Sequence, residues 1–246
     1  MLTNVTDSDL DRRHAPTDDR EVVGWVHRTA ALTRPDNVVW CDDASRDLAG
    51  LIETLLATGA LVRPTPATVV PVALPALPLA VREQTLMGVE RHTSAPSSTH
   101  SRDADALRAE VALAFEDCMR GRAMYVVPFA AGVCADGETA VGVQVTDSAF
   151  VAAVLLASYA TLPATALKAH PCLIRAVHSV GRPVPSENIP QGDAPWPHHA
   201  RPWLARFPSQ RETWSFGTAY EPRLATVVGR PLSLAGLAEA GTASAA

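Results

Sequence analysis

Cysteine pairs, long apolar runs and a leader-like start are all missing from this sequence. Its four cysteines, Cys41, Cys118, Cys134 and Cys172, form no CxxC pair, so neither a zinc knuckle nor a disulfide framework is predicted. No apolar stretch reaches the roughly 18 residues that a membrane-spanning helix needs. The first residues contain neither a basic region nor an apolar core, so we expect no signal peptide. These absences favour a cytoplasmic protein with buried free thiols and no membrane partner.

An excess of basic residues is also missing. The 246 residues include 21 Lys or Arg and 26 Asp or Glu, which gives a net charge of −5. Without a basic stripe to contact phosphates, nucleic acid is not expected as a partner. The composition is 47% hydrophobic and 19% charged, as is typical of a globular protein that buries a core without disulfide or metal staples.

Helical and strand patterns alternate along the chain. Apolar spacing predicts helices over residues 20–32, 44–58, 103–119, 149–160 and 231–238. Strands are predicted at residues 38–40, 61–62, 124–129, 140–145, 173–177 and 212–216. The proline-rich residues 63–79 oppose both a helix and a central strand. The alternation predicts one α/β (mixed α+β) domain over residues 20–240, a flexible N-terminal arm over 1–19 and a disordered tail over 241–246.

One stretch says most about ancestry. Residues 118–129 read CMRGRAMYVVPF, which resembles the "GCM-GRTMYVVPF" segment of the GTP-dependent phosphoenolpyruvate carboxykinases. Further matches follow in the family's order: WCDD at 40–43, GVQVTDS at 142–148, HSVGRP at 178–183, PWP at 195–197 and SFGTAY at 215–220. The resemblance covers about residues 22–238 and implies the mixed α/β N-terminal domain of the carboxykinase fold, as a single domain.

The resemblance also implies a division of labour. In that family the N-terminal domain supplies an arginine and a Tyr-Gly-Gly loop for oxaloacetate or phosphoenolpyruvate, followed by a lysine that contacts manganese. The family's other half supplies the phosphate-binding loop, further metal ligands and the guanine pocket. This sequence contains no GxxxxGK[ST] motif, whose backbone N–H groups would hold phosphates. We therefore expect no metal ion, no cofactor and no autonomous GTP-dependent activity.

The family's substrate arginine has no clear counterpart. Our alignment places Ala80 at its position, and Arg82 follows two residues later. An alanine cannot bind a carboxylate, whereas a guanidinium does so with two hydrogen bonds. Two explanations remain open. Either Arg82 replaces the family's arginine from a position two residues away, or the alignment is shifted by two residues in this proline-rich segment.

The Tyr-Gly-Gly loop and the lysine position have also changed. The loop reads Tyr220, Glu221 and Pro222, and Pro231 follows Arg230 at the lysine position. Proline lacks a backbone donor, and the charge of glutamate would repel an anion. Proline also has no side-chain atom that could bind a metal ion, and arginine is a poor metal ligand.

The sequence therefore predicts a rebuilt pocket around the retained tyrosine. Tyr220 and Glu221 are the predicted catalytic residues, with Glu221 as an acid or base whose pKa an apolar wall would raise. The predicted substrate-binding residues are Arg82, Gly217, Arg223 and Arg230.

Several functions remain open at this point. The favoured interpretation is a cofactor-independent biosynthetic enzyme of lyase, cyclase or isomerase type, acting on a small organic acid or a biosynthetic intermediate. The alternative is a non-catalytic binding, regulatory or self-associating module, in which the former inter-domain face would pair two copies. Residual phosphoenolpyruvate carboxykinase activity is the least favoured.

Two polar residues of the matched motifs are predicted to be structural. His178 and Ser179 are neighbours on a predicted strand, so their side chains point to opposite faces and cannot form a base–nucleophile pair. Asp147 is predicted to be the N-cap of the helix that begins at residue 149.

Overall fold

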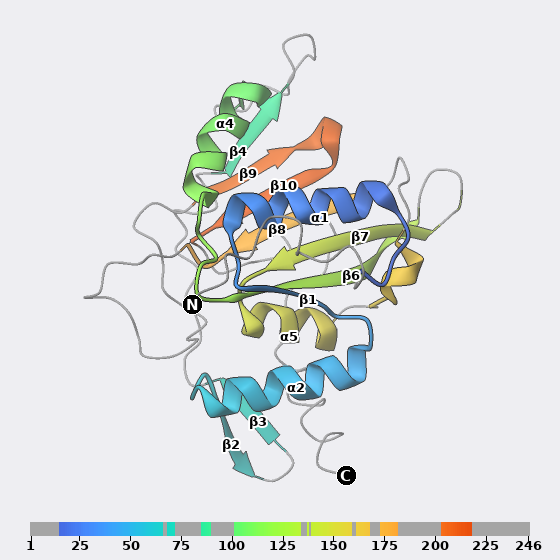
Figure 1. Cartoon of the computed structure of the whole chain (residues 1–246), viewed down its shortest axis with the longest axis vertical. Coiled ribbons are helices and arrows are strands. Elements are labelled where there is room, and N and C mark those ends of the chain that lie inside the picture. The colour runs from blue at the N-terminus through green and yellow to red at the C-terminus, as the bar shows by residue number, and fades with distance from the viewer. Residues whose placement is uncertain are drawn as a thin grey trace, which may run out of the picture.

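A mixed eight-stranded sheet organises the described part of the chain. The computed structural model describes residues 15–65, 68–71, 85–89, 101–133, 137, 139–158, 161–167, 173–181 and 203–217. The strand order is β1-β6-β7-β8-β10-β9-β4-β5. Helices α1 and α4 cover one face of the sheet, and α5 and α2 lie on the other (Figure 1). The expected mixed α/β fold is confirmed.

The strands differ in direction across the sheet. Their bounds are β1 Asn37–Trp40, β4 Thr85–Val89, β5 Ser101–Asp103, β6 Ala123–Val133, β7 Thr139–Thr146, β8 Ile174–Ser179, β9 Trp203–Phe207 and β10 Glu212–Phe216. The pairs β6–β7 and β9–β10 are antiparallel, and the other five pairs are parallel. A separate antiparallel pair joins β2 Leu61–Thr65 to β3 Thr68–Pro71. The described residues of the proline-rich segment thus belong to strands outside the main sheet.

Aspartates begin three of the helices. These helices are α1 Arg20–Thr33, α2 Ala44–Ala57 and α4 Ala104–Phe115. The side chains of Asp19, Asp43 and Asp103 accept backbone N–H groups of the first turn, each of which would otherwise lack a partner. Asp43 caps α2 by accepting from Arg46 N at 3.1 Å. The fourth helix, α5, spans Ala149–Ser158.

The prediction for residues 103–119 is wrong at its C-terminal end. The helix stops at Phe115, and Asp117 adopts a left-handed φ of 57°. The backbone N–H groups of Asp117 and Met119 instead donate to Leu32 O and Thr33 O at the end of α1, at 3.0 and 2.9 Å. Contacts with α1 therefore outweigh the helical pattern of these last residues.

Two apolar cores lie on opposite faces of the sheet. On the α1/α4 face, Phe115 meets Trp214 edge-on, with ring centroids 4.8 Å apart. On the other face, α5 lies between the sheet and α2, and its residues 149–156 are all buried. Of the described helices, none combines the length and the hydrophobicity that crossing a bilayer requires.

The predicted N-terminal arm is described only from residue 15 onward. Thr17 is buried, and its Oγ1 donates to Leu167 O at 3.1 Å. Asp19 then caps α1. Residues 15–19 are thus anchored to the domain, whereas residues 1–14 and the predicted tail at 241–246 lie outside the described residues.

Candidate functional site

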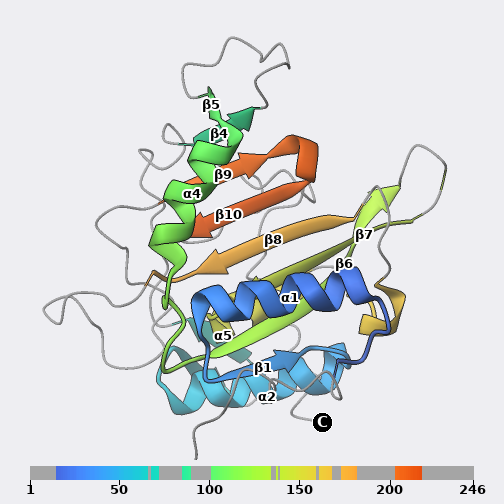
Figure 2. The same ribbon diagram turned by 45° about the horizontal axis from the view of Figure 1, so that its top comes forward.

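Three neighbouring strands end together at one side of the sheet. β7, β8 and β10 are parallel, with Thr146 paired to His178 and His178 paired to Ser215. The arrowheads of β7 and β8 point the same way in Figure 1, as do those of β8 and β10 in Figure 2. Ligands of open α/β sheets bind outside the carboxyl ends of parallel strands. The carboxyl end of β7–β8–β10 is therefore the candidate site.

A buried carboxylate holds this end of the sheet together. Asp147 Oδ2 accepts from Arg122 Nη2 at 2.6 Å and from Ser179 Oγ at 2.7 Å. Its Oδ1 accepts from Val180 N at 2.9 Å, and Ser179 Oγ accepts from Gly181 N at 3.1 Å. The network joins the ends of β7 and β8 to the residue before β6. Because each carboxylate oxygen has a strong donor, Asp147 acts as a structural anchor.

The predicted capping role of Asp147 is wrong. Ser148 Oγ accepts from Val151 N at 3.3 Å, so Ser148 caps α5. Asp147 points instead to Arg122 and Ser179. Charge-assisted hydrogen bonds to a buried guanidinium are stronger than a cap bond to a neutral N–H. This explains why Asp147 bonds to Arg122 while Ser148 caps the helix.

Gly217 is the predicted substrate-binding residue that the structure describes. It follows β10 directly, has a φ of 62°, and donates from its N–H to Ser179 O at 2.9 Å. A positive φ favours glycine because it has no Cβ. The chain thus leaves the sheet at the candidate site. The other predicted site residues lie outside the described residues: Arg82, Tyr220, Glu221, Arg223 and Arg230.

A patch of polar side chains, which the sequence analysis did not single out, lies on the α5 face of the sheet. Alternation along a strand sends successive side chains to opposite faces, and the valines at 143, 145 and 177 belong to the α1/α4 core. The residues between and beside them therefore face α5. We call this set the polar patch: Gln144, Thr146, His178, Thr213 and Ser215, all buried. The strict alternation of GVQVTDS was the signal that could have revealed it.

One half of the polar patch is well bonded. Thr146 Oγ1 accepts from Ser148 N at 3.1 Å and lies 2.7 Å from His178 Nδ1. The hydroxyl can donate to Nδ1 or accept from it, so Thr146 and His178 are hydrogen-bonded in either tautomer of the ring. Ser179, on the opposite face, is bonded to Asp147. His178 and Ser179 therefore form no catalytic pair, as the strand geometry predicts.

Gln144 is the exception in the polar patch. Its side chain is 0% exposed, and neither Oε1 nor Nε2 has a hydrogen-bond partner among the residues that the structure describes. An unpaired buried amide costs about 1–3 kcal/mol. Such a group therefore has a high affinity for any polar atom that reaches it.

Two cysteines near the sheet are chemically inert. Burial, with a smaller contribution from Asp147, raises the pKa of Cys118 to about 12. Burial, with a smaller contribution from Asp47, raises the pKa of Cys41 to about 12. Both thiols are protonated at neutral pH, so neither acts as a nucleophile or metal ligand.

The residues present do not fit the manganese ion that the family resemblance implies. No group of three or more His, Cys, Asp or Glu side chains in the described stretches could hold a metal ion. The position of the family's metal-contacting lysine falls on Pro231, which has no side-chain ligand atom.

Comparison with known proteins identifies the family. The family described as "Phosphoenolpyruvate carboxykinase N-terminal domain" matches residues 24–222. Phosphoenolpyruvate carboxykinase (GTP) of Renibacterium salmoninarum is 31% identical over 213 residues, which are 84% of this chain and 35% of the relative. The protein of the same name from Corynebacterium kroppenstedtii is 29% identical over 212 residues, 84% of this chain and 34% of the relative.

A further relative agrees with these two. Phosphoenolpyruvate carboxykinase (GTP) of Paenarthrobacter aurescens is 31% identical over 213 residues, again 84% of this chain and 34% of the relative. The chain therefore spans about a third of the length of the curated relatives it matches. With most of its length matched by the family and its expected sheet in place, the chain belongs to the phosphoenolpyruvate carboxykinase N-terminal domain family.

Proposed function

We propose that this domain binds a small organic acid beyond the carboxyl end of β7–β8–β10 and acts on it as a cofactor-independent lyase, cyclase or isomerase. The observation that carries the proposal is the path of the chain after β10. Gly217 leaves the sheet beside Ser179, with its left-handed φ and its hydrogen bond to Ser179 O. Tyr220 and Glu221 follow within four residues, so a short connection ties them to this end of the sheet.

Loss of GTP-dependent carboxykinase activity is part of the proposal. Three positions that carry the family's substrate and metal contacts hold Ala80, Pro222 and Pro231. Alanine removes a guanidinium, and the prolines remove a backbone donor and a metal-binding amine. Phosphoryl transfer depends almost wholly on such positioning and charge stabilisation, so these replacements favour a different reaction.

Glu221 and Tyr220 supply the chemistry that we propose. A carboxyl group shielded from water has a raised pKa and exchanges protons near neutral pH, which suits a general acid or base. A tyrosine hydroxyl beside it can donate to a developing oxyanion. Arg82, Arg223 and Arg230 would hold the acid group of the substrate.

A thermal-shift panel on the full chain tests ligand choice. We expect oxaloacetate or phosphoenolpyruvate to raise Tm, since a ligand at 100 times its Kd adds about 2.7 kcal/mol of stability. GTP with manganese should cause no shift. Arg223→Ala should abolish the carboxylate effect, and Arg46→Ala, an exposed arginine of α2, should retain it. GTP-dependent turnover of oxaloacetate by this chain would contradict the proposal.

Metabolite profiling of cells that express the full chain or its variants tests catalysis. We expect Tyr220→Phe and Glu221→Gln to accumulate a substrate and deplete a product, while both variants stay folded. If metabolite levels are unchanged in both variants and carboxylate binding is retained, the protein is a binding module and not an enzyme.

We also propose the cytoplasm as its location. The support is chemical: Cys41 and Cys118 are free and buried, which suits a reducing compartment. Fractionation of cells that express the full chain should recover it with cytoplasmic markers, and its recovery from the medium would contradict this.

A further inference from the structure

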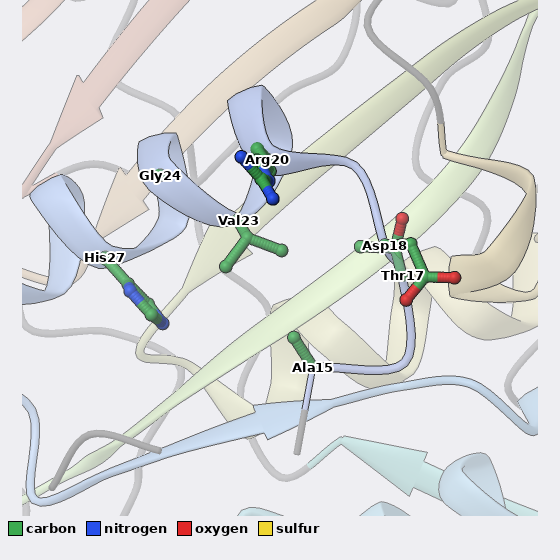
Figure 3. A pocket seen from close by; sticks show the side chains of 7 residues that line it. All are labelled: Ala15, Thr17, Asp18, Arg20, Val23, Gly24 and His27. Carbon is green, nitrogen blue, oxygen red and sulfur yellow. The ribbon is translucent and has the colours of Figure 1, made fainter. Parts of the chain in front are cut away.

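A pocket of about 570 Å³ lies on the flank of α1, between its first two turns and the segment that precedes them. Arg20, Gly24 and His27 line it from the helix, at spacings of three and four residues that place them on one face. Figure 3 shows Val23 and His27 pointing from α1 toward the segment that carries Asp18. The volume falls in the range typical of small-molecule sites.

This pocket is separate from the carboxyl end of β7–β8–β10. Asp36, just after α1, donates from its N–H to Arg122 O at 2.9 Å, beside the Asp147 network. The last turn of α1 therefore lies at the carboxyl end, and Arg20 begins the helix at the opposite end. A helix of 14 residues is roughly 20 Å long. A ligand in this pocket would be distinct from the organic acid proposed above.

Two arginines and a histidine lie around the pocket. Arg20 and His27 line it, and the guanidinium of Arg28 lies over Gly24. Within the described part of the chain, none of these three side chains forms an ion pair or a hydrogen bond. Asp18 is the carboxylate among the residues that line the pocket. Unpaired guanidinium groups around a recess favour a carboxylate or phosphate, which they bind with two hydrogen bonds each.

Gly24 provides a second, independent observation. Glycine in the interior of a helix is destabilising relative to alanine, so its presence asks for a reason. A Cβ at Gly24 would stand 3.2 Å from Arg28 Nη1, so the guanidinium would have to shift by a few tenths of an ångström. Gly50, the interior glycine of α2, has no atom within 4 Å of such a Cβ. Of these two helix-interior glycines, Gly24 is thus the one beside which a guanidinium lies.

We propose that this α1 pocket binds a small organic anion, with a carboxylate or phosphate group held by Arg20, Arg28 and His27. Val23 contacts the apolar part of the ligand. Thr17 Oγ1 donates to Leu167 O and accepts from Asp19 N, so the carboxylate of Asp18 is the acceptor left for the ligand. A hydroxyl or amino group on the ligand therefore faces Asp18.

Isothermal titration calorimetry of the full chain with inorganic phosphate and with malonate tests the proposal. We expect saturable binding of at least one probe, and the probe that binds identifies the acid group. Arg20→Ala and Arg28→Ala should each weaken it at least about tenfold, because each removes a charge-assisted bidentate contact. Absence of saturable heat with both probes, or wild-type affinity in both arginine variants, would overturn the proposal.

Matched glycine variants separate binding from folding. Gly24→Ala should weaken binding while Tm stays at or above that of the wild type, because alanine favours the helix but displaces Arg28. Gly50→Ala should raise Tm and leave binding unchanged. Arg223→Ala removes a residue of the proposed organic-acid site, so it should leave unchanged the component of binding that Gly24→Ala weakens. Loss of probe binding in Arg223→Ala, with wild-type binding in Gly24→Ala, would assign the probe to the carboxyl end of β7–β8–β10 and reject the α1 pocket.

Discussion

The two faces of the central sheet treat buried polar groups differently. On the α1/α4 face, Glu212 is buried, yet Trp25 Nε1 donates to its Oε1 at 3.0 Å and Arg108 Nη2 to its Oε2 at 3.0 Å. On the α5 face, neither side-chain atom of Gln144 has a partner among the described residues, and on the α1/α4 face the indole Nε1 of Trp214 also lacks one. A paired buried charge is tolerated, whereas an unpaired buried amide reduces stability. The first face therefore neutralises the charge that it buries, whereas the second buries a complete amide group that stability alone does not explain.

Aromatic packing reinforces the contrast. Arg108 lies over Phe207, 4.1 Å from its centroid, and Phe115 packs between Trp214 and Phe216. The α5 face is apolar where α5 covers β6 and β7, and carries the polar patch along β7, β8 and β10. This difference predicts that removal of a buried polar group lowers the free energy of unfolding on the α1/α4 face and raises it on the α5 face.

The largest effect is expected from the α1/α4 core. Phe115→Ala removes a fully buried ring that contacts two other rings, and should lower the free energy of unfolding by about 3–5 kcal/mol. Leu113→Ala, on the same helix but 74% exposed, should change it by less than about 0.5 kcal/mol. Urea denaturation measures both. Equal losses in the two variants would mean that Phe115 is no more buried than Leu113, which would contradict the packing of α4 described above.

The next effect concerns the paired charge. Glu212→Ala leaves the indole N–H of Trp25 without an acceptor and Arg108 without its counter-ion. Because the Arg108 side chain is 30% exposed, we expect a loss of about 2–3 kcal/mol, below that of a fully buried pair. Glu53→Ala breaks a pair with Arg63 in which the glutamate is 67% exposed, and should cost under about 1 kcal/mol. A smaller loss for Glu212→Ala than for Glu53→Ala would refute the role of this network.

A pair of reciprocal substitutions tests the two faces directly. Gln144→Met keeps the size of the side chain and removes the unpaired amide, so it should raise the free energy of unfolding by about 1–2 kcal/mol. Val145→Thr, the next residue on the opposite face, buries a new hydroxyl and should lower it by a similar amount. Chemical denaturation of both variants checks the signs. Destabilisation by Gln144→Met would show that the amide has a bonding role in the free protein.

Local signals in the sequence were enough for several elements. The bounds predicted for the strand at residues 212–216 agree with β10, and those predicted for α2 agree to within one residue. The predictions missed β3, β4, β5 and β9. β9 pairs with β10 across a turn in which Arg211 has a φ of 50°, and β4 pairs with β9, more than a hundred residues away in sequence. Such distant pairings leave no periodic pattern in a single sequence.

The candidate site was harder to predict for the same reason. Asp147 looked like a helix cap because its neighbours in sequence suggest one, but its partner Arg122 lies 25 residues away. Gln144 was not singled out because nothing local in the sequence indicates that its amide lacks a partner. Gly217 was identified from the family resemblance, and its φ of 62° gives a physical reason for glycine there.

The smallest effect is expected from the buried thiols and appears only at high pH. Burial raises the pKa of Cys118 from 9.0 to about 12, so between these values the unfolded chain loses the thiol proton and the folded protein keeps it. The contribution of Cys118 to stability is complete below pH 9 and falls as the pH rises toward 12, by about 1.4 kcal/mol per pH unit. At pH 10, wild type should therefore have lost about 1 kcal/mol more, relative to its own value at pH 8, than Cys118→Ala. Urea denaturation at the two pH values measures this difference, and the comparison with the variant cancels the tyrosines and lysines that titrate in the same range. An equal fall in both proteins would mean that the Cys118 thiol ionises as readily in the folded protein as in the unfolded chain, and would contradict its burial beside Asp147.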